Sequence, residues 1–335
     1  MRLRWTSAVL SPLGCAGCVG WQSAMDPQGP QAEHLHRLIW LFTGVAAVIW
    51  LLVMLSLALA IWRRRDRSDE PVVPTNAARE RRSAVVVFMA VGATVGVIAG
   101  LTLASYLATR QVSEASAEPL KIRVQGYQWW WQVSYLDPAA ARQITTANEI
   151  HIPVGRPVNI ELAAADVIHS FWVPNLAGKM DLIPGRDNRL EFTVARPGQY
   201  RGQCAEFCGL QHAHMALLVM AESEADFETW QNAQLAPSAA PDSDERRSGR
   251  QIVTGKACGA CHTVRGTEAA GTIGPDLTHV ASRAYIAAGV LPTTRGSLAA
   301  WVADPQTIKP GNNMPMVPLT ADELRAVSAY LSALK

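Results

Sequence analysis

The run QCAEFCGLQHAHM, residues 203–215, combines thiol, imidazole and thioether side chains at spacings that suit a metal. It contains Cys204, Cys208, His212 and Met215, and His169 lies 35 residues before the first cysteine. An exported protein could oxidise the two cysteines to a disulfide. Zinc would accept the two thiolates together with two imidazoles. Neither alternative explains the methionine.

A blue copper site uses one cysteine, two histidines and a weak axial methionine on a β-sandwich. This run contains that set and one further cysteine. Two thiolates on one loop can bridge two copper ions, each with one terminal histidine. Shared bridges delocalise the unpaired electron and reduce the rearrangement on redox change. The pattern favours a copper site for electron transfer, with the disulfide and zinc sites as alternatives.

A second group is CGACH, residues 258–262, which matches the C-x-x-C-H pattern of haem attachment. Cys258 and Cys261 lie about one helical turn apart, so both sulfurs can reach the vinyl groups of one porphyrin. His262 can then bind the iron as the proximal ligand. A thioredoxin-like dithiol would need a βαβ context, which this sequence lacks. The motif predicts a covalent haem c.

The distal haem ligand is expected in KPGNNMPMVPL, which contains Met314 and Met316. A thioether opposite histidine raises the reduction potential, which suits electron transfer. The Met-Pro pair after a Gly-Asn loop resembles the methionine loop of class I cytochromes c, which favours Met314 and leaves Met316 as the alternative. GTIGPDL resembles the Gly-Pro-x-Leu segment of those cytochromes, where the Pro275 carbonyl would orient His262.

Two apolar stretches precede this chemistry. Residues 38–62 and 83–109 contain no charged side chain, and about 20 helical residues cross the hydrocarbon core. They predict a transmembrane hairpin over residues 35–110. The connection RRRDRSDEPVVPTNAARERR is rich in arginine, so we expect it on the cytoplasmic side. Everything after Arg110 then lies on the opposite face.

The first 18 residues pair two arginines with a short apolar run and small residues. They predict an export signal, with Cys18 or Cys15 as the acylated residue of a lipoprotein-like segment, or else an uncleaved external tail.

Beyond the hairpin, residues 111–232 alternate apolar and polar positions between Pro and Gly turns, as in a β-sandwich or a Greek-key β-barrel. The polar run 233–249 is expected to be a flexible linker, and residues 250–335 are helical in pattern. The net charge of +2 gives no reason to expect a nucleic acid partner. The expected fold class is a multi-domain membrane protein with a transmembrane hairpin, an all-β domain and an all-α domain.

The pattern C-x-E-x-C-x3-H-x2-M, together with DVIHSFWVP and GYQWWW, resembles subunit II of cytochrome c oxidase with its binuclear copper A centre. The resemblance covers the hairpin and a cupredoxin-like domain, and the fused domain resembles class I cytochrome c. It implies that Cys204 and Cys208 bridge the coppers. The remaining implied ligands are His169, His212, Met215 and the Glu206 backbone carbonyl, and the Glu206 carboxylate would reach a magnesium or manganese ion shared with subunit I.

The resemblance also implies that Trp129 is the exposed point at which electrons enter, while Trp130 and Trp131 pack. Electrons would pass from haem c to copper A and then to haem a of subunit I, where oxygen is reduced to water and protons are pumped. Implied partners are subunits I and III, a cytochrome c or upstream complex as donor, and the lipid bilayer of a bacterial inner membrane. The alternatives are a copper-bearing subunit of a nitric oxide reductase, a stand-alone membrane-tethered carrier, and a zinc or disulfide scaffold.

Overall fold

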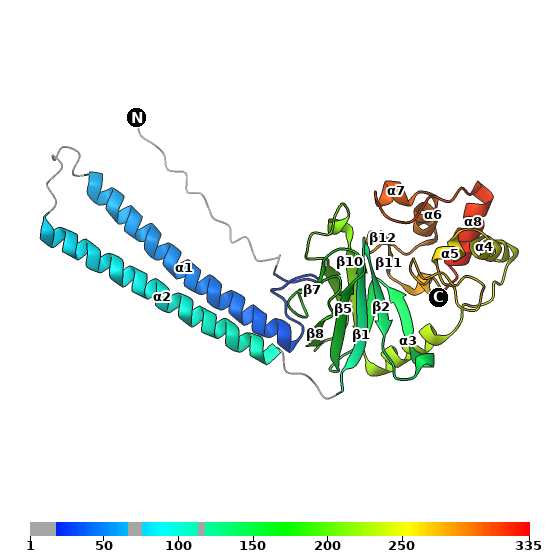
Figure 1. Ribbon diagram of the computed structural model, residues 1–335, viewed down its shortest axis with the longest axis horizontal. Coiled ribbons are helices and arrows are strands. Elements are labelled where there is room, and N and C mark those ends of the chain that lie inside the picture. Colours follow the sequence, from blue (N-terminus) through cyan, green and yellow to red (C-terminus); the bar gives the residue numbers. More distant parts are fainter. Residues whose placement is uncertain (1–17, 66–75, 113–117) are drawn as a thin grey trace, which may run out of the picture. The chain divides into compact units, whose positions relative to one another are not determined.

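The computed structural model describes residues 18–65, 76–112 and 118–335 (Figure 1). The expected signal segment therefore lies outside the described residues except for Cys18, and the middle of the arginine-rich connection also lies outside them. The chain divides into two compact units. Residues 33–115 form one unit, and the rest of the described chain forms the other.

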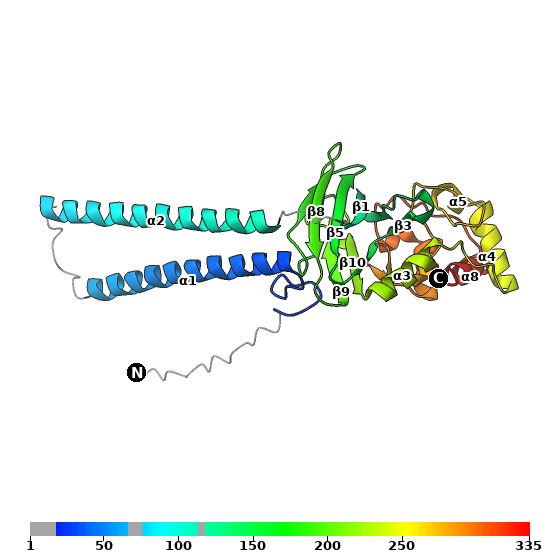
Figure 2. The same cartoon turned by 90° about the horizontal axis from the view of Figure 1, so that it is seen from below.

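The first unit consists of two long helices, α1 (Pro30–Arg65) and α2 (Ala77–Val112). Figures 1 and 2 show that they run in opposite directions. Each has 36 residues, which at about 1.5 Å per residue exceeds the thickness of a bilayer core. Large apolar side chains such as Trp50 and Phe88 are exposed along them. Both helices are long and apolar enough to cross a membrane.

The second unit contains a β-sandwich over residues 120–222, here called the sandwich domain. Its larger sheet has the strand order β3-β2-β1-β5-β8 and its smaller sheet the order β4-β10-β9. Burial alternates along the strands, as in BeBiBiBi for β1, because successive side chains point to opposite faces. The fully buried Trp131, Phe171 and Phe192 lie between the sheets. The strands of the two sheets are β1 (Leu120–Tyr127), β2 (Trp130–Tyr135), β3 (Ile144–Ala147), β4 (Glu149–Pro153), β5 (Pro157–Ala164), β8 (Asn188–Thr193), β9 (Gly198–Gln203) and β10 (Ala216–Glu222).

A separate short hairpin, β6 (His169–Phe171) with β7 (Met180–Leu182), completes the sandwich domain. Helix α3 (Glu224–Leu235) follows β10 and begins at Ser223, whose hydroxyl accepts a hydrogen bond from the Asp226 amide. This is the helix that the capping pattern predicts at this point.

Residues 244–335 form a helical domain. Helices α4 (Asp244–Gly255) and α8 (Ala321–Leu331) pack closely together. They lie so close at Gly249 that a side chain there would come within 2.1 Å of the Ala326 carbonyl oxygen. Thr320 and Glu323 form the capping box expected from the sequence. The other elements are α5 (Cys258–Cys261), β11 (Tyr285–Ile286), β12 (Leu291–Pro292), α6 (Arg295–Ala303) and α7 (Pro305–Ile308).

The predicted fold class is confirmed: two apolar helices, a cupredoxin-like β-sandwich and a helical domain of the cytochrome c type. Within the stretch 233–249, which we predict to be a linker, α3 continues to Leu235 and α4 begins at Asp244. The non-helical connection is therefore residues 236–243. Ser238 in this connection is held by its amide and hydroxyl, which both donate to the Arg265 carbonyl, at 2.9 and 2.8 Å.

Candidate metal centres

The candidate copper ligands lie on two turns of the sandwich domain. His169 begins strand β6, and the loop between β9 and β10 carries the others. This loop is closed at its base, since the Cys204 amide donates to the Met215 carbonyl at 2.9 Å and the strands pair at once beyond it. The ligands at both ends of the loop are thus positioned by strand pairing.

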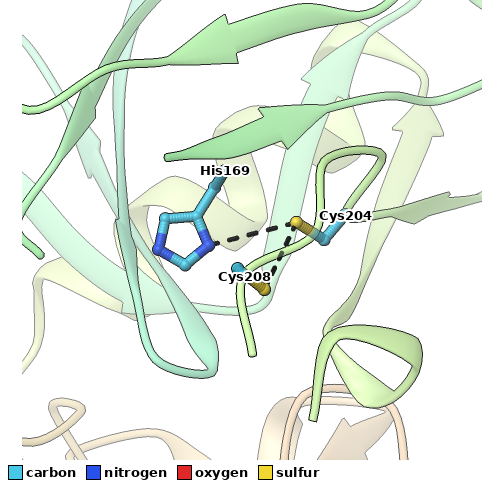
Figure 3. Close-up of side chains that lie close together, drawn as sticks. All are labelled: His169, Cys204 and Cys208. Atoms are coloured by element: carbon cyan, nitrogen blue, oxygen red, sulfur yellow. Dashed lines mark hydrogen bonds between the residues drawn. The ribbon is translucent and has the colours of Figure 1, made fainter. Parts of the chain in front are cut away.

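Figure 3 shows His169, Cys204 and Cys208 turned toward one another. The two sulfur atoms lie 3.8 Å apart, and Nδ1 of His169 lies 4.0 Å from the Cys204 sulfur. The ligand atoms of these three buried residues all lie within 4.8 Å of one another. On the other side, the Cys208 sulfur lies 3.7 Å from His212 Nδ1 and 3.8 Å from Met215 Sδ. Each sulfur therefore has its own imidazole.

This spacing fits shared metal ligands rather than a disulfide. A disulfide brings its sulfurs to about 2.05 Å, well below the observed separation. Two sulfurs at about 2.3 Å from one tetrahedral ion stand about 3.8 Å apart, so the pair is spaced to bind a common ion. Zinc would accept the thiolates and imidazoles but leaves Met215 unexplained. The donor set as a whole fits copper.

His169 is oriented by groups around its ring. Its Nε2 lies 2.8 Å from Oδ1 of Asp166, which leaves Nδ1 for a metal. The ring packs directly against Gly126, where a side chain would come within 2.8 Å of the imidazole. This explains the glycine that opens the GYQWWW motif. Burial opposes the charged form of His169, but Cys204 and Asp166 raise its pKa above the usual range.

The two thiols are electrostatically linked. The hydrogen bond between the two sulfurs lowers the pKa of Cys204, and the same bond together with burial raises the pKa of Cys208. One proton therefore leaves the pair readily and the second is retained. A cation between the sulfurs would stabilise both thiolates and displace that second proton.

Glu206 faces the centre with its backbone and solvent with its side chain. Its carbonyl oxygen lies 3.3 Å from the Cys204 sulfur, and its side chain is exposed. The exposed Phe207 and Leu210 lie on the same loop, at 77% and 78% exposure. Apolar side chains so exposed beside a buried site indicate a surface that another protein covers.

The candidate haem ligands surround a cavity in the helical domain. Cys258, Cys261, His262 and Met314 all line it, and apolar side chains cover most of the remaining wall. His262 Nδ1 lies 2.7 Å from the Pro275 carbonyl oxygen. Because a carbonyl can only accept, Nδ1 carries the proton and Nε2 is free to bind iron.

The wall beside His262 requires a glycine. A side chain at Gly274 would lie 2.5 Å from the His262 ring. Burial lowers the pKa of His262, which favours the neutral imidazole that a metal needs. The apolar wall, the oriented histidine and the two nearby thiols fit a covalently attached haem.

The two methionines differ in position. Met314 is half-buried, lines the cavity and packs against the core of the helical domain. Its amide donates to Asn312 Oδ1 at 2.8 Å, and its carbonyl accepts from Gln306 at 3.0 Å. Met316 is 60% exposed and does not line the cavity. The geometry therefore favours Met314 as the distal ligand.

Trp129 differs from expectation in its exposure. We predict an exposed tryptophan, but it is only 7% exposed, because the helical domain covers it. A side chain at Gly311 would lie 3.6 Å from the Trp129 ring, and the cavity of the candidate haem ligands is lined by Trp129 and Trp130. The indole N–H of Trp129 donates to the Cys208 carbonyl at 2.9 Å. The prediction of an exposed site is wrong, and Trp129 instead lies between the two centres.

The motifs did not assign a role to two residues of this region. Asp166 lies in DVIHSFW, three residues before the histidine that it orients, and that spacing was a usable signal. Lys309 begins KPGNNM, and its ammonium group is buried between the two domains. Nothing in the local sequence separates it from a surface lysine.

Comparison with known proteins agrees with this geometry. Residues 120–222 match the family described as cytochrome c oxidase subunit II, periplasmic domain, and residues 247–335 match the cytochrome c family. Cytochrome c oxidase subunit 2 of Alkalihalophilus pseudofirmus is 34% identical over 348 residues, which cover 100% of this chain and 99% of that protein. The chain belongs to the cytochrome c oxidase subunit II family.

Two other subunit II relatives are similar. Cytochrome c oxidase subunit 2 of Bacillus subtilis is 29% identical and is matched over 97% of this chain and 96% of its own length. The crystal structure of the periplasmic domain of subunit II from Bradyrhizobium japonicum is 30% identical and covers 37% of this chain and 96% of that chain, with a TM-score of 0.33.

Membership of the subunit II family makes this chain part of a cytochrome c oxidase, in association with other oxidase subunits. Its two family domains imply copper and haem as cofactors. The apolar helices and the periplasmic type of domain fit a membrane-anchored protein whose sandwich domain lies outside the cytoplasm.

Proposed function

We propose that this chain is the electron-input subunit of its oxidase. Electrons would be received at haem c, held by Cys258, Cys261, His262 and Met314, and passed to copper A. From there they would go to haem a of subunit I, where oxygen is reduced to water and protons are pumped. The bound haem and copper would supply one-electron redox chemistry. The observation that carries this proposal is the wall of Trp129 and Trp130 at the candidate haem cavity.

Each part of the chain has a role in this proposal. Cys204 and Cys208 would bridge two coppers, with His169 and His212 as terminal ligands. Met215 and the Glu206 carbonyl would be the weak ligands. Trp129 supports electron transfer because its indole is bonded to the carbonyl of a candidate ligand residue while its ring faces the helical domain.

The exposed surface beside the copper site would face subunit I. Phe207 and Ile168 present apolar surface there, at 77% and 43% exposure. The exposed Glu206 carboxylate would reach a magnesium or manganese ion shared with that subunit, since hard cations prefer oxygen ligands. Subunit III and a cytochrome c or upstream complex as donor complete the proposed assembly.

The proposed topology has two crossings. Residues 38–62 and 83–109 would span a bacterial inner membrane, with the arginine-rich connection in the cytoplasm. Both metal domains would then lie on the periplasmic face.

The test is purification of the complex from membranes, with subunit identification, optical spectra and oxygen uptake. The near-infrared copper band and the haem c band should both be present. Cys208→Ser should abolish the copper band and oxygen uptake while the haem c band persists, because only the bridging thiolate is removed. Met316→Leu is the matched control and should leave all three unchanged. A copper band that survives in Cys208→Ser, or a chain that purifies without other oxidase subunits, would contradict the proposal.

A further inference from the structure

Lys309 is the most deeply buried charged side chain between the two metal domains. It is 3% exposed. Its ammonium group donates to the carbonyl oxygens of Trp129, His214 and Ala287, at 2.7, 2.9 and 3.1 Å. An ammonium group has three donors, and here all three are used. A lysine so buried is costly to keep, and burial lowers its pKa to about 7.

The three acceptors link both sides of the interface. Trp129 and His214 belong to the sandwich domain, and Ala287 belongs to the helical domain. Trp129 donates its indole N–H to the Cys208 carbonyl. His214 lies on the copper ligand loop, between His212 and Met215. One ammonium group therefore bonds the turn that carries Trp129 and the copper ligand loop to the helical domain.

Lys309 also begins the segment that leads to Met314. The next residue, Pro310, accepts a hydrogen bond from Gln211 of the copper ligand loop at 2.9 Å. Gly311 follows with φ of 82°, a left-handed conformation that favours glycine. A side chain there would meet Leu210 at 3.2 Å. The segment carrying the candidate haem ligand thus lies directly on the loop carrying the candidate copper ligands.

A second group of contacts holds the same two domains together. The Ala216 amide donates to the Ala288 carbonyl at 3.0 Å, and the Ala284 amide donates to Glu149 Oε2 at 2.9 Å. Both amides donate across the interface between the two domains. Their exchange with solvent therefore reports whether the domains are docked.

We propose that Lys309 is a positioning residue that locks the helical domain onto the copper ligand loop, so that the electron passes between two centres held in fixed contact. This rests on the proposed electron-input function. In the step concerned, one electron would pass from the group held by Cys258, Cys261, His262 and Met314, which would be oxidised, to the group held by the copper ligand loop, which would be reduced. No bond is made or broken, and no proton is transferred.

The test uses the purified complex with its haem and copper, and three side chains at position 309. Lysine offers three N–H donors, Lys309→Gln offers two and Lys309→Met offers none at similar length. The haem is reduced by a light pulse, and its reoxidation is followed together with the bleaching of the copper band. Lys121→Met is the matched control, because Lys121 is exposed on β1, away from the interface.

Lys309→Met should slow this internal electron transfer by about tenfold or more, because loss of charge-assisted hydrogen bonds lowers the docked fraction. The glutamine variant should lie between it and the wild type. Both metal spectra and direct reduction of copper by a small reagent should be unchanged. Amide exchange in peptides containing Ala216 and Ala284 should rise in the same order.

Unchanged transfer and unchanged amide exchange in Lys309→Met would overturn the proposal. If that variant does not assemble, Lys309→Gln decides by the same two criteria. Failure of the proposed function gives a different result: the wild-type complex itself would lack the copper band or would show no internal transfer. Wild-type transfer with no effect of either Lys309 variant would refute only the role of Lys309.

Discussion

The copper ligand loop and the haem cavity prepare for their metals in different ways. At the copper site the protein alone brings the donor atoms of His169, Cys204 and Cys208 within 4.8 Å of one another, and the strands pair at once beyond the ligand loop. In the helical domain the donors surround an apolar cavity instead, and only His262 is oriented by a short bond, to Pro275. One site is closed by its fold, and the other is left open for a large group.

The difference shows which site depends on its cofactor for folding. The β-sandwich has a continuous core of buried side chains, which includes the candidate copper ligands Cys204, Cys208 and Met215. The helical domain has a smaller core, and residues such as Val327 and Leu331 face the cavity as well as each other. Haem would therefore complete the hydrophobic core, whereas copper would occupy a site that the strands already define.

The largest expected effect comes from removing each cofactor in turn. Without haem, as in the Cys258→Ser/Cys261→Ser double variant, α4 and α8 should lose stability. An empty cavity of about 190 Å³ costs up to about 5 kcal/mol, at about 24 cal/mol per Å³. Copper removal by a chelator should leave the sandwich strands protected. Hydrogen exchange measured separately for the two domains checks both outcomes.

Equal protection of the α4 and α8 amides from hydrogen exchange, with and without haem, would contradict the idea that haem completes the core of the helical domain. So would loss of protection throughout β9 and β10 on copper removal. The chelated wild-type protein serves as its own control, because the haem is covalent and remains attached.

The second prediction concerns the two methionines after the Gly-Asn loop. Met314→Leu should remove the thioether from the cavity and lower the haem potential by roughly 0.1 V or more, a fraction of the ~0.8 V that axial ligands span. Met316→Leu, at an exposed position, should leave the potential unchanged. Redox titration of the haem band distinguishes them, and the reverse result would assign the iron to Met316.

The third prediction exploits a parallel between the sites, since a glycine makes room for a histidine in each. A side chain at Gly126 would lie 2.8 Å from the His169 ring, and one at Gly274 would lie 2.5 Å from the His262 ring. Replacing either glycine with alanine should displace its histidine at a cost of about 1–3 kcal/mol. The copper band should weaken only in Gly126→Ala, and the haem ligation spectrum should change only in Gly274→Ala.

Gly296→Ala is the matched control, because a side chain there would meet only Thr294, at 3.9 Å. Altered copper spectra in Gly274→Ala would show that displacing the haem histidine also disturbs the copper site.

Much of this arrangement could be predicted from sequence because the chemistry is local. Both cysteine motifs have fixed spacings, and strand alternation and the apolar helices follow from side-chain periodicity. The preference for Met314 over Met316 also came from the sequence, through a resemblance, and the geometry favours it. The roles of the individual ligands remain predictions.

What the sequence could not provide depends on contacts between domains. Trp129 is buried because a domain more than 100 residues later covers it, which no local pattern encodes. Lys309 gives the same sequence signal as a surface lysine until the acceptors around it are known. Asp166 differs from both, because it lies only three residues before the histidine that it orients, and that spacing was a usable sequence signal.

The smallest expected effect concerns how each histidine is oriented. His262 is bonded to a main-chain carbonyl, which no side-chain substitution removes. His169 depends on the Asp166 carboxylate, which lies 2.8 Å from its Nε2 and also accepts from the Gln128 amide at 2.7 Å. Asp166→Asn keeps the shape but removes the charge and one acceptor. It should lower copper affinity by about 10- to 100-fold, the usual cost of losing such a partner, and leave the haem potential unchanged.

Competition with a copper chelator measures that affinity. Asp187→Asn is the matched control, because Asp187 is exposed and pairs with Arg123 at the surface. Wild-type affinity in Asp166→Asn would mean that strand pairing alone positions His169. The copper site would then depend on the main chain as fully as the haem histidine does. A loss of copper affinity would show that strand pairing is not sufficient, and that the copper site also needs the Asp166 carboxylate to orient the His169 ring.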